Sequence, residues 1–303
     1  MQDFHHRTAV ITGAASGFGL EASRIAARLG MNVVMADIQA DALERAAEEI
    51  RAHGVDVVAE RVDVSRGAEV EALAAVTKSR FGAPHFVFNN AGVGTGGLVW
   101  EHSVRDWEWV LGVNLWGVIH GVRCFTPMML EAAAADAAYE GHIVNTASMA
   151  GLVNMPNMGV YNVSKHAVVS LSESLYQDLA LVTDRVHAHV LCPFFVATGI
   201  HESHRNRPTA LHDPGARPTK SQLIAQANSE KAVTSGKVSA ADVAGYVFDA
   251  LREHRFYIYS HPKALRGVQY RMEDILALRN PSDPYLDRPE IGKALREALR
   301  GVK

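Results

Sequence analysis

Short apolar runs alternate with longer amphipathic segments over the first two thirds of the chain. The apolar runs are continuous rather than alternating, which indicates strands covered on both faces, as in a parallel sheet. Repeated strand–helix units of this kind predict a doubly wound α/β fold. The predicted strands span 8–12, 32–36, 56–61 and 86–88, and the predicted helices between them span 17–29, 40–53 and 67–80.

Two long helical patterns, at 104–135 and 161–182, dominate the middle of the chain. Strands expected at 142–145 and 186–192 continue the alternation. Both helices are apolar nearly all round, so one face of each can cover the sheet while the other requires a second partner. The simplest partner is a copy of the same chain, and we therefore expect a homodimer or homotetramer.

The apolar pattern weakens after Pro193. Residues 201–220 contain three prolines among polar residues and predict a mobile connection. A loop this long in a compact domain is typically a lid, and we expect a substrate lid at about 194–236. A helical pattern returns at 240–253, and a last strand is expected at 256–259.

Composition narrows the classes of function. The 303 residues carry a formal net charge of -3, so there is no broad basic field and no nucleic-acid partner is expected. The 2 cysteines lie in separate apolar segments, which fits a reducing compartment without a disulfide framework. The sequence opens without a signal-peptide pattern, and no run of about 18 uncharged apolar residues indicates a membrane span. We expect a cytoplasmic protein with no membrane partner.

A glycine-rich turn, Thr12–Gly19, lies between the first predicted strand and the first predicted helix. Gly13 permits a tight turn, Gly17 lets the backbone approach a pyrophosphate, and Gly19 allows close packing of helix on strand. The amino terminus of the helix offers free N–H groups and a positive dipole end to phosphates. A glycine cluster alone is also typical of an ordinary turn, but its position between strand and helix favours a dinucleotide site.

An acidic residue, Asp37, ends the second predicted strand. Its carboxylate can accept hydrogen bonds from both hydroxyls of an adenosine ribose, and it would repel a 2′-phosphate. No lysine or arginine occupies Ser16, Ile38 or Gln39 to neutralise such a phosphate. The sequence therefore predicts NAD rather than NADP as the cofactor, and capping of a turn or helix is the alternative role of Asp37.

Tyr161 and Lys165 lie four residues apart at the start of a predicted helix, downstream of Ser148. Residues i and i+4 share a helix face, so the ammonium can lie near the phenol. Oxidation of an alcohol needs a base that ionises near neutral pH. An adjacent Lys⁺ and a nicotinamide cation would lower the ordinary tyrosine pKa of about 10. Ser148, at the carboxyl end of a strand, would hold the substrate oxygen.

Together these motifs resemble the short-chain dehydrogenases/reductases over about residues 7–260. The matching segments are Thr12–Gly19, Asp63–Val64, Asn89–Gly92, Asn114, Ser148, Tyr161–Lys165 and Pro193–Thr198. The resemblance implies a Rossmann-like fold with a seven-stranded parallel sheet and a catalytic tetrad of Asn114, Ser148, Tyr161 and Lys165. It makes Tyr161 the general acid/base, gives Lys165 a second role at the nicotinamide ribose, and lets Asn114 anchor a water that relays the proton.

The resemblance also assigns residues to the cofactor. It places Asp63, Val64 and Asn89 on the adenosine side, and Val196 and Thr198 at the carboxamide. The full set of predicted cofactor-binding residues is Gly13, Ser16, Gly17, Phe18, Gly19, Asp37, Asp63, Val64, Asn89, Ala91, Gly92, Tyr161, Lys165, Pro193, Val196 and Thr198.

Two features depart from the family pattern. Pro193-Phe194 stands where the family usually has Pro-Gly, so a phenyl ring is expected in the pocket, and the chain continues past Ser260 beyond the usual length. We predict a single dinucleotide-binding and catalytic domain at 1–260 and a C-terminal extension at 261–303. The expected pocket walls are apolar, with a place in the core as the alternative for several of them: Val93, Leu98, Val99, Met149, Leu152, Met155, Met158, Phe194 and Phe195.

The predicted function is NAD-dependent interconversion of a hydrophobic, aromatic or alicyclic secondary alcohol and its ketone. A non-catalytic NAD(H)-binding regulator and a nucleotide-sugar epimerase or dehydratase remain as alternatives on the same fold. The Tyr161–Lys165 pair disfavours the regulator, and the glycine spacing differs from that of the epimerases. Among the 15 histidines, His201 and His204 lie three apart in a polar loop without acidic or cysteine companions, so no metal site is predicted.

Overall fold

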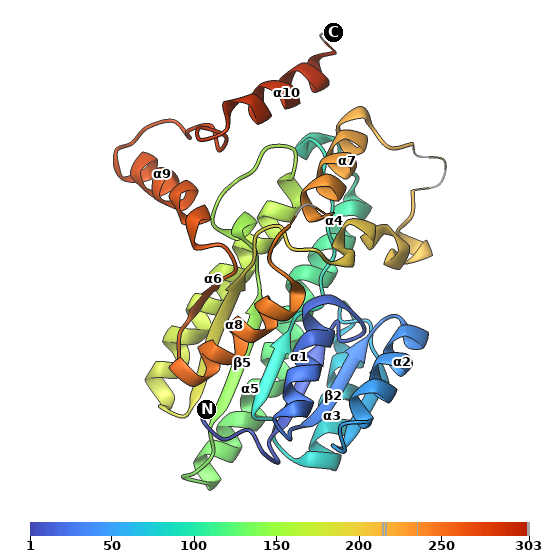
Figure 1. The fold of residues 1–303 in the computed structure, drawn as a ribbon, viewed down its shortest axis with the longest axis vertical. Helices are drawn as coiled ribbons and strands as arrows, with labels where there is room; N and C mark the ends of the chain where they lie inside the picture. The colour runs from blue at the N-terminus through green and yellow to red at the C-terminus, as the bar shows by residue number, and fades with distance from the viewer. Residues whose placement is uncertain (214, 216, 235, 302–303) are drawn as a thin grey trace.

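A seven-stranded sheet, parallel throughout, forms the centre of the protein (Figure 1). The computed structural model describes residues 1–213, 215, 217–234 and 236–301. The strand order is β3-β2-β1-β4-β5-β6-β7, which confirms the predicted doubly wound, Rossmann-like fold. The strands are β1 (Thr8–Thr12), β2 (Asn32–Asp37), β3 (Val57–Arg61), β4 (Phe86–Asn89), β5 (Gly141–Thr146), β6 (Val186–Cys192) and β7 (Tyr257–Tyr259).

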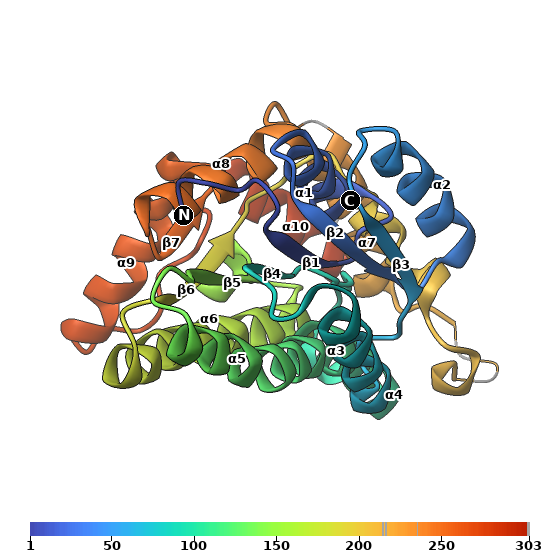
Figure 2. The same cartoon turned by 90° about the horizontal axis from the view of Figure 1, so that it is seen from below.

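Helices cover both faces of this sheet, as Figure 2 shows from below. Helices α1, α2 and α8 pack on one face, and α3, α5 and α6 pack on the other. All residues of β1 and β5 are buried because each strand has helices on both sides, and this explains the continuous apolar runs. The ten α-helices of the described residues are α1 (Gly17–Arg28), α2 (Ala40–Arg51), α3 (Gly67–Phe81), α4 (Val104–Leu111), α5 (Gly117–Ala135), α6 (Gly159–Val182), α7 (Lys220–Thr234), α8 (Ala240–Glu253), α9 (Leu265–Leu276) and α10 (Pro289–Arg300).

The helix predicted over 104–135 is interrupted in the structure. A capping box between Ser103 and Asp106 starts α4, which ends at Leu111. A π-helical turn, Gly112–Trp116, then precedes α5. Such turns widen a helix locally and occur frequently at functional sites, and this one carries Asn114. Hydrophobic spacing could not reveal the turn because the apolar face continues through it.

The segment predicted as a mobile connection contains helices. Short 3-10 helices span Gly199–Asn206 and Thr209–Leu211, and α7 begins at Lys220. Helix α7 has little amphipathic pattern because it packs on loops rather than on the sheet, which is why the sequence did not predict it. The lid predicted at 194–236 also includes Pro214, Ala216 and Ser235, which lie outside the described residues.

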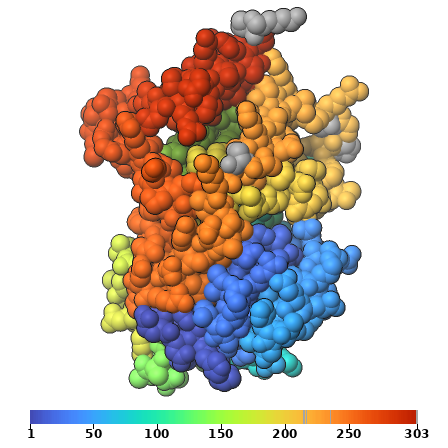
Figure 3. All heavy atoms as spheres, in the orientation of Figure 1, coloured from blue at the N-terminus to red at the C-terminus, as the bar shows by residue number. Residues whose placement is uncertain are grey.

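The C-terminal extension forms two helices, α9 and α10, which were not predicted from the sequence. In the space-filling view this segment lies across one end of the molecule, above the lid (Figure 3). Helix α10 contacts α7, and Leu265 and Val268 of α9 pack on a core cluster beneath them. The predicted extension ends with Val302 and Lys303, which lie outside the described residues.

Across the described ranges, no helix has the length and apolar character needed to cross a bilayer.

Candidate active site

The candidate site lies where the strand order reverses. Strand β1 pairs with β2 on one side and with β4 on the other, so the loops after β1 and β4 diverge above a crevice. A Cβ atom at Gly13 would lie 3.0 Å from Ala91 Cα, and one at Gly19 would lie 2.2 Å from the carbonyl oxygen of Gly13. Any side chain at Gly13 or Gly19 would clash, so glycine at both positions lets the loop after β1, the loop after β4 and helix α1 pack this closely.

The amino terminus of α1 opens into the same crevice. Ser16 is the N-cap residue, but its side chain caps no backbone N–H group of the helix. N–H groups of the first helical turn that no side chain caps can donate hydrogen bonds to phosphate oxygens. Gly17 has a φ of 54°, and a Cβ there would lie 3.5 Å from the Thr198 side chain, so Thr198 faces the helix terminus from above. Phe18 packs against the core at the edge of this turn.

Asp37 ends β2 beside the glycine-rich turn. Its carboxylate accepts hydrogen bonds from the backbone N–H groups of Ala15 and Gln39, both at 3.0 Å. Burial raises the pKa of Asp37, and the two backbone donors oppose this rise. A carboxylate fixed by two donors keeps lone pairs for further hydroxyl groups, as the expected ribose contact requires.

Arg205 is a residue near the site that sequence reasoning missed. It lies in the 3-10 helix Gly199–Asn206, and its positive charge is among the influences that lower the pKa of Asp37. Its guanidinium donates to the Gly199 carbonyl at 3.0 Å and to Glu202 at 3.3 Å. No basic residue occupies the positions next to Asp37, and no local signal could indicate an arginine this distant in sequence.

Ser148, Tyr161 and Lys165 come together on the other side of the crevice. Ser148 follows β5 and caps a short 3-10 helix, and the other two residues lie one turn apart on α6. The Lys165 ammonium donates to the Thr146 carbonyl at 2.8 Å and lies 5.7 Å from the centroid of the Tyr161 ring. All three side chains are at least nine-tenths buried.

Burial shifts the pKa values of Tyr161 and Lys165. Burial raises the pKa of Tyr161 to about 12, and only the Ser148 hydroxyl acts in the opposite direction. Burial also lowers the pKa of Lys165 to about 8. In the chain without a ligand, burial of Tyr161 therefore raises the phenol pKa by more than the Lys165 ammonium could lower it. The lower phenol pKa that the sequence predicts depends on Lys165 together with a nicotinamide cation, and it stays a prediction for the protein with its cofactor bound.

Asn114 has its amide fully engaged. Its Oδ1 accepts from the Val93 N–H at 2.8 Å, and its Nδ2 donates to the Val93 carbonyl at 3.0 Å and to Ser164 Oγ at 3.1 Å. Both amide hydrogens are used, so only a remaining lone pair of Oδ1 or the main-chain carbonyl is left to hold a water. A Cβ at Gly92 would lie 3.4 Å from Asn114 Oδ1 and 3.6 Å from Lys165 Nζ, which places Gly92 between these two residues.

The remaining predicted cofactor residues differ in orientation. Asn89 Nδ2 donates to Asn145 Oδ1 at 2.9 Å, and its Oδ1 lies against Gly121 of α5, so any cofactor contact of Asn89 is limited to its main chain. Asp63 holds the following turn through Ser65, and Val64 is buried in the core. Pro193 and Val196 are buried after β6.

Three of the predicted pocket walls are buried. Val93 is buried with Trp109 and Val110, and Met149 and Leu152 belong to a core cluster reached by α9. Tyr161 and Lys165 are buried to a similar degree, so a place of these three residues in the pocket stays a prediction beside the alternative of a core position. The other walls remain at least partly exposed: Leu98, Val99, Met155, Met158, Phe194 and Phe195.

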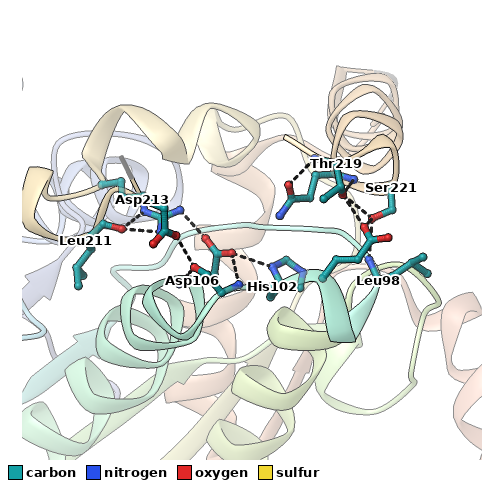
Figure 4. A network of polar contacts seen from close by, with 11 residues as sticks. Leu98, His102, Asp106, Leu211, Asp213, Thr219 and Ser221 are labelled. Atoms are coloured by element: carbon teal, nitrogen blue, oxygen red, sulfur yellow. Dashed lines mark hydrogen bonds and ion pairs between the residues drawn. The ribbon is translucent and has the colours of Figure 1, made fainter. Parts of the chain in front are cut away.

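A polar network fastens the lid to the start of α4 (Figure 4). Arg207 donates to Asp106 at 2.6 Å, and Ser103 Oγ donates to Asp213 at 2.5 Å. Burial alone would raise the pKa of Asp106, but hydrogen bonds from His102, Ser103 and Arg207 hold it well below its usual range. The carboxylate therefore stays charged and pairs with the lid.

A second set of contacts fastens the lid to the loop after β4. Ser203 Oγ accepts from the Gly94 N–H, and Ser221 Oγ accepts from the Leu98 N–H, both at 2.9 Å. Ser221 also donates to Glu101 at 2.6 Å. The lid is thus docked over the loop that carries Leu98, and sequence reasoning missed these serines because the partners are more than 100 residues apart.

Comparison with known proteins agrees with this geometry. Residues 7–209 match the family model described as short chain dehydrogenase. A short-chain dehydrogenase/reductase from Burkholderia phymatum, solved in complex with NAD, is 51% identical and superposes with a TM-score of 0.90 over 94% of this chain and 99% of that chain.

Two curated relatives also match over most of their length. The "CLA biosynthesis dehydrogenase/reductase" of Lactiplantibacillus plantarum is 32% identical over 95% of this chain and 99% of its own. The 1-deoxy-11-beta-hydroxypentalenate dehydrogenase of Streptomyces avermitilis is 36% identical over 88% and 89%, respectively. The chain therefore belongs to the short-chain dehydrogenase/reductase family of oxidoreductases.

Proposed function

We propose that the protein is an NAD-dependent dehydrogenase that interconverts a hydrophobic secondary alcohol and its ketone. The observation that carries the proposal is the convergence of Ser148, Tyr161 and Lys165 after β5, at the same edge of the sheet as the glycine-rich terminus of α1. The NAD complex of the relative from Burkholderia phymatum adds support for the choice of cofactor.

The residues around the crevice fit a dinucleotide. The backbone of Gly13, Ser16 and Gly17 would receive the pyrophosphate at the terminus of α1. The Asp37 carboxylate would accept from the adenosine ribose hydroxyls, and Lys165 would hold the nicotinamide ribose. When bound, NAD supplies the acceptor of a hydride at its nicotinamide ring and a positive charge near the phenol.

The chain's own residues would manage the proton. The Ser148 hydroxyl orients the substrate oxygen, and the Tyr161 phenolate accepts the alcohol proton as the C–H bond breaks. The Lys165 ammonium stabilises the phenolate in a buried setting where charges interact strongly. With NAD⁺ bound, the products would be ketone, NADH and one proton, and that proton would leave Tyr161 through a water held by Asn114.

Apolar side chains at the crevice support a hydrophobic substrate. Met155, Met158, Phe194 and Phe195 are at least partly exposed in the segments that follow Ser148 and β6, and the rings of the two phenylalanines lie 4.7 Å apart between centroids. The relative from Streptomyces avermitilis, named as a hydroxypentalenate dehydrogenase, supports an alicyclic alcohol. Aromatic and alicyclic secondary alcohols are therefore the proposed class.

We also infer a homodimer or homotetramer formed through α5 and α6. Helix α6 exposes large apolar side chains, among them Val163, Tyr176 and Leu181, of which Leu181 is 83% exposed, and Trp116 directly before α5 is 52% exposed. Burial of such a patch against a second copy would remove it from water. Analytical ultracentrifugation of the chain tests this, and a monomer at all concentrations would contradict it.

A panel of alicyclic and aryl secondary alcohols tests the proposed activity. NADH absorbance should rise with at least one of them, and more slowly or not at all with NADP in place of NAD. Tight binding of NAD(H) without NADH release by any alcohol would contradict the proposal and favour a regulator or an epimerase.

A further inference from the structure

A cluster of metal-ligating side chains lies at the other edge of the sheet, far from the active site. Glu140 directly precedes β5, His142 lies at its start, and His254 follows α8 in a left-handed conformation with φ of 53°. Glu140 Oε1 lies 3.0 Å from His142 Nε2 and 2.8 Å from His254 Nε2, and these three atoms all lie within 4.8 Å of one another. Ligand atoms of a tetrahedral zinc site, with bonds of about 2.0–2.2 Å, lie about 3.4 Å apart. The cluster therefore needs little movement to bind an ion.

Hydrogen bonds fix the buried imidazole for this role. His142 is fully buried, and its Nδ1 lies 2.9 Å from His189 Nε2. His189 Nδ1 in turn lies 2.9 Å from the Arg255 carbonyl, which can only accept. The hydrogen therefore sits on Nδ1 of each neutral ring, and Nε2 of His142 presents its lone pair to the cluster. A histidine held by its second nitrogen is the usual arrangement for a metal ligand.

A cation already lies at the centre of the cluster. The Met1 ammonium is 2.6 Å from Glu140 Oε1, 3.2 Å from His142 Nε2 and 3.3 Å from His254 Nε2. It also donates to the Leu251 carbonyl at 2.8 Å. Convergence of a carboxylate and two imidazole nitrogens on one positive group shows that the cluster attracts a cation at this point.

The surroundings leave room for further ligands. The cluster borders a surface cavity of about 510 Å³ that is also lined by His187. The His187 ring lies 4.3 Å from that of His254, centroid to centroid. A water molecule from this cavity, or the His187 imidazole after a rotation, can complete a four-ligand shell around the ion.

We propose that Glu140, His142 and His254 form a zinc-binding site, with Oε1 and the two Nε2 atoms as ligands and the ion in place of the Met1 ammonium. Two histidines and one glutamate are a ligand set that binds Zn²⁺ in proteins. The prediction that there is no metal site rested on His201 and His204, because Glu140, His142 and His254 meet only in the folded chain.

The position of the site defines its role. It joins the N-terminal segment, the start of β5 and the end of α8, whereas α7 of the lid lies at the opposite end of the molecule (Figure 1). Ser148, Tyr161 and Lys165 follow the other end of β5. Figure 2 shows the N-terminus beside α8 and β7 at the near end. The bound ion therefore stabilises the fold and takes no part in hydride transfer.

Titration of the untagged chain with Co²⁺, a spectroscopic substitute for Zn²⁺, tests the proposal. We expect one Co²⁺ per chain with the intense visible bands of a tetrahedral site, loss of these bands on addition of Zn²⁺, and a higher unfolding temperature with Zn²⁺. Glu140→Gln and His254→Ala should each weaken binding by on the order of 100-fold. Both side chains are partly exposed, so their removal is compatible with folding.

His53→Ala is the matched control, because His53 is an exposed histidine on another surface. It should leave Co²⁺ binding unchanged, and chelation should leave NAD binding unchanged. The proposal is overturned if the chain gives no Co²⁺ bands, if Glu140→Gln and His254→Ala bind as well as the original chain, or if His53→Ala removes the bands.

Discussion

Ionisable side chains gather at both edges of the sheet, but their hydrogen-bond partners differ between the two edges. At the carboxyl edge Lys165 is buried beside the Thr146 carbonyl, and burial lowers its pKa to about 8. At the amino edge His142 and His189 form a hydrogen-bonded chain that ends on a carbonyl and faces a carboxylate. Burial also lowers the pKa of His142 to about 4, so pKa values displaced by burial occur at both edges. The edges differ in their partners: the amino-edge rings are hydrogen-bonded to each other and to the Arg255 carbonyl, whereas Lys165 lies beside the phenol that is the candidate acid/base.

The comparison also explains why the phenol needs a partner that the chain does not supply. Burial raises the pKa of Tyr161 to about 12, and the nearby ammonium is itself disfavoured by burial. A dinucleotide with a cationic ring would favour the phenolate electrostatically. The carboxyl edge is therefore organised for a bound cofactor, and the amino edge is organised for the protein's own stability.

The largest expected effect is that of Tyr161→Phe. Turnover should fall by about 10²–10⁴-fold, the range of a lost general base, while NAD affinity changes little. Tyr246→Phe is the control, since Tyr246 lies on α8 and is 37% exposed. NADH formation and fluorescence titration with NAD measure the two quantities. Retained turnover in Tyr161→Phe would refute the role of the phenol.

Asp37→Ala should lower the ratio of kcat/KM with NAD to kcat/KM with NADP by about 10- to 100-fold. The variant loses charge-assisted hydrogen bonds to ribose, worth about 1.5–3 kcal/mol, and no longer repels a 2′-phosphate that Arg205 can then approach. Ratios of kcat/KM for the two cofactors measure the change. Asp41→Ala, an exposed acid four residues on, should leave the ratio as it is. An unchanged ratio in Asp37→Ala would contradict the ribose contact.

Lys165→Met should abolish activity yet stabilise the protein by about 2–3 kcal/mol at pH 7. The folded-state pKa of about 8 lies below the ordinary 10.5, so at pH 7 the fold bears the cost of a buried charge. Between these pKa values the unfolded chain binds more protons, so stability of the original chain rises with pH. The gain from Lys165→Met should therefore shrink as pH rises from 8 towards 10.5.

Urea unfolding at pH 7 and pH 9.5 measures this difference. Lys231→Met, at an exposed position of α7, should show no gain at either pH. A loss of stability in Lys165→Met at pH 7 would mean that the Thr146 hydrogen bond outweighs the burial of charge, and would contradict the contrast between the two edges.

Asn114→Ala should have the smallest effect, about 1–2 kcal/mol of unfolding free energy. It leaves the Val93 N–H and carbonyl without their partners in a buried place. Turnover should fall more than cofactor affinity, because the substitution loosens the π-helical turn next to Lys165. Thermal unfolding and steady-state kinetics measure both, with the exposed Asn154→Ala as control. Equal loss of cofactor affinity and turnover would argue against a role in proton relay.

The sequence by itself determined the fold, the glycine-rich turn and the Tyr161–Lys165 pair. These features depend on short-range regularities: continuous apolar runs, glycines at fixed offsets and residues one helical turn apart. A parallel sheet brings the carboxyl ends of its strands to one edge, so the sequence could also place Ser148 beside this pair.

Only the tertiary structure decided the features that depend on distant partners. Arg205 approaches Asp37, the lid serines reach the loop after β4, and Glu140 meets His254 across the amino edge. The burial that displaces the pKa values of Tyr161 and Lys165 likewise comes from elements packed around α6. No local pattern encodes such contacts, because each side chain is placed by the packing of whole elements rather than by its neighbours in sequence.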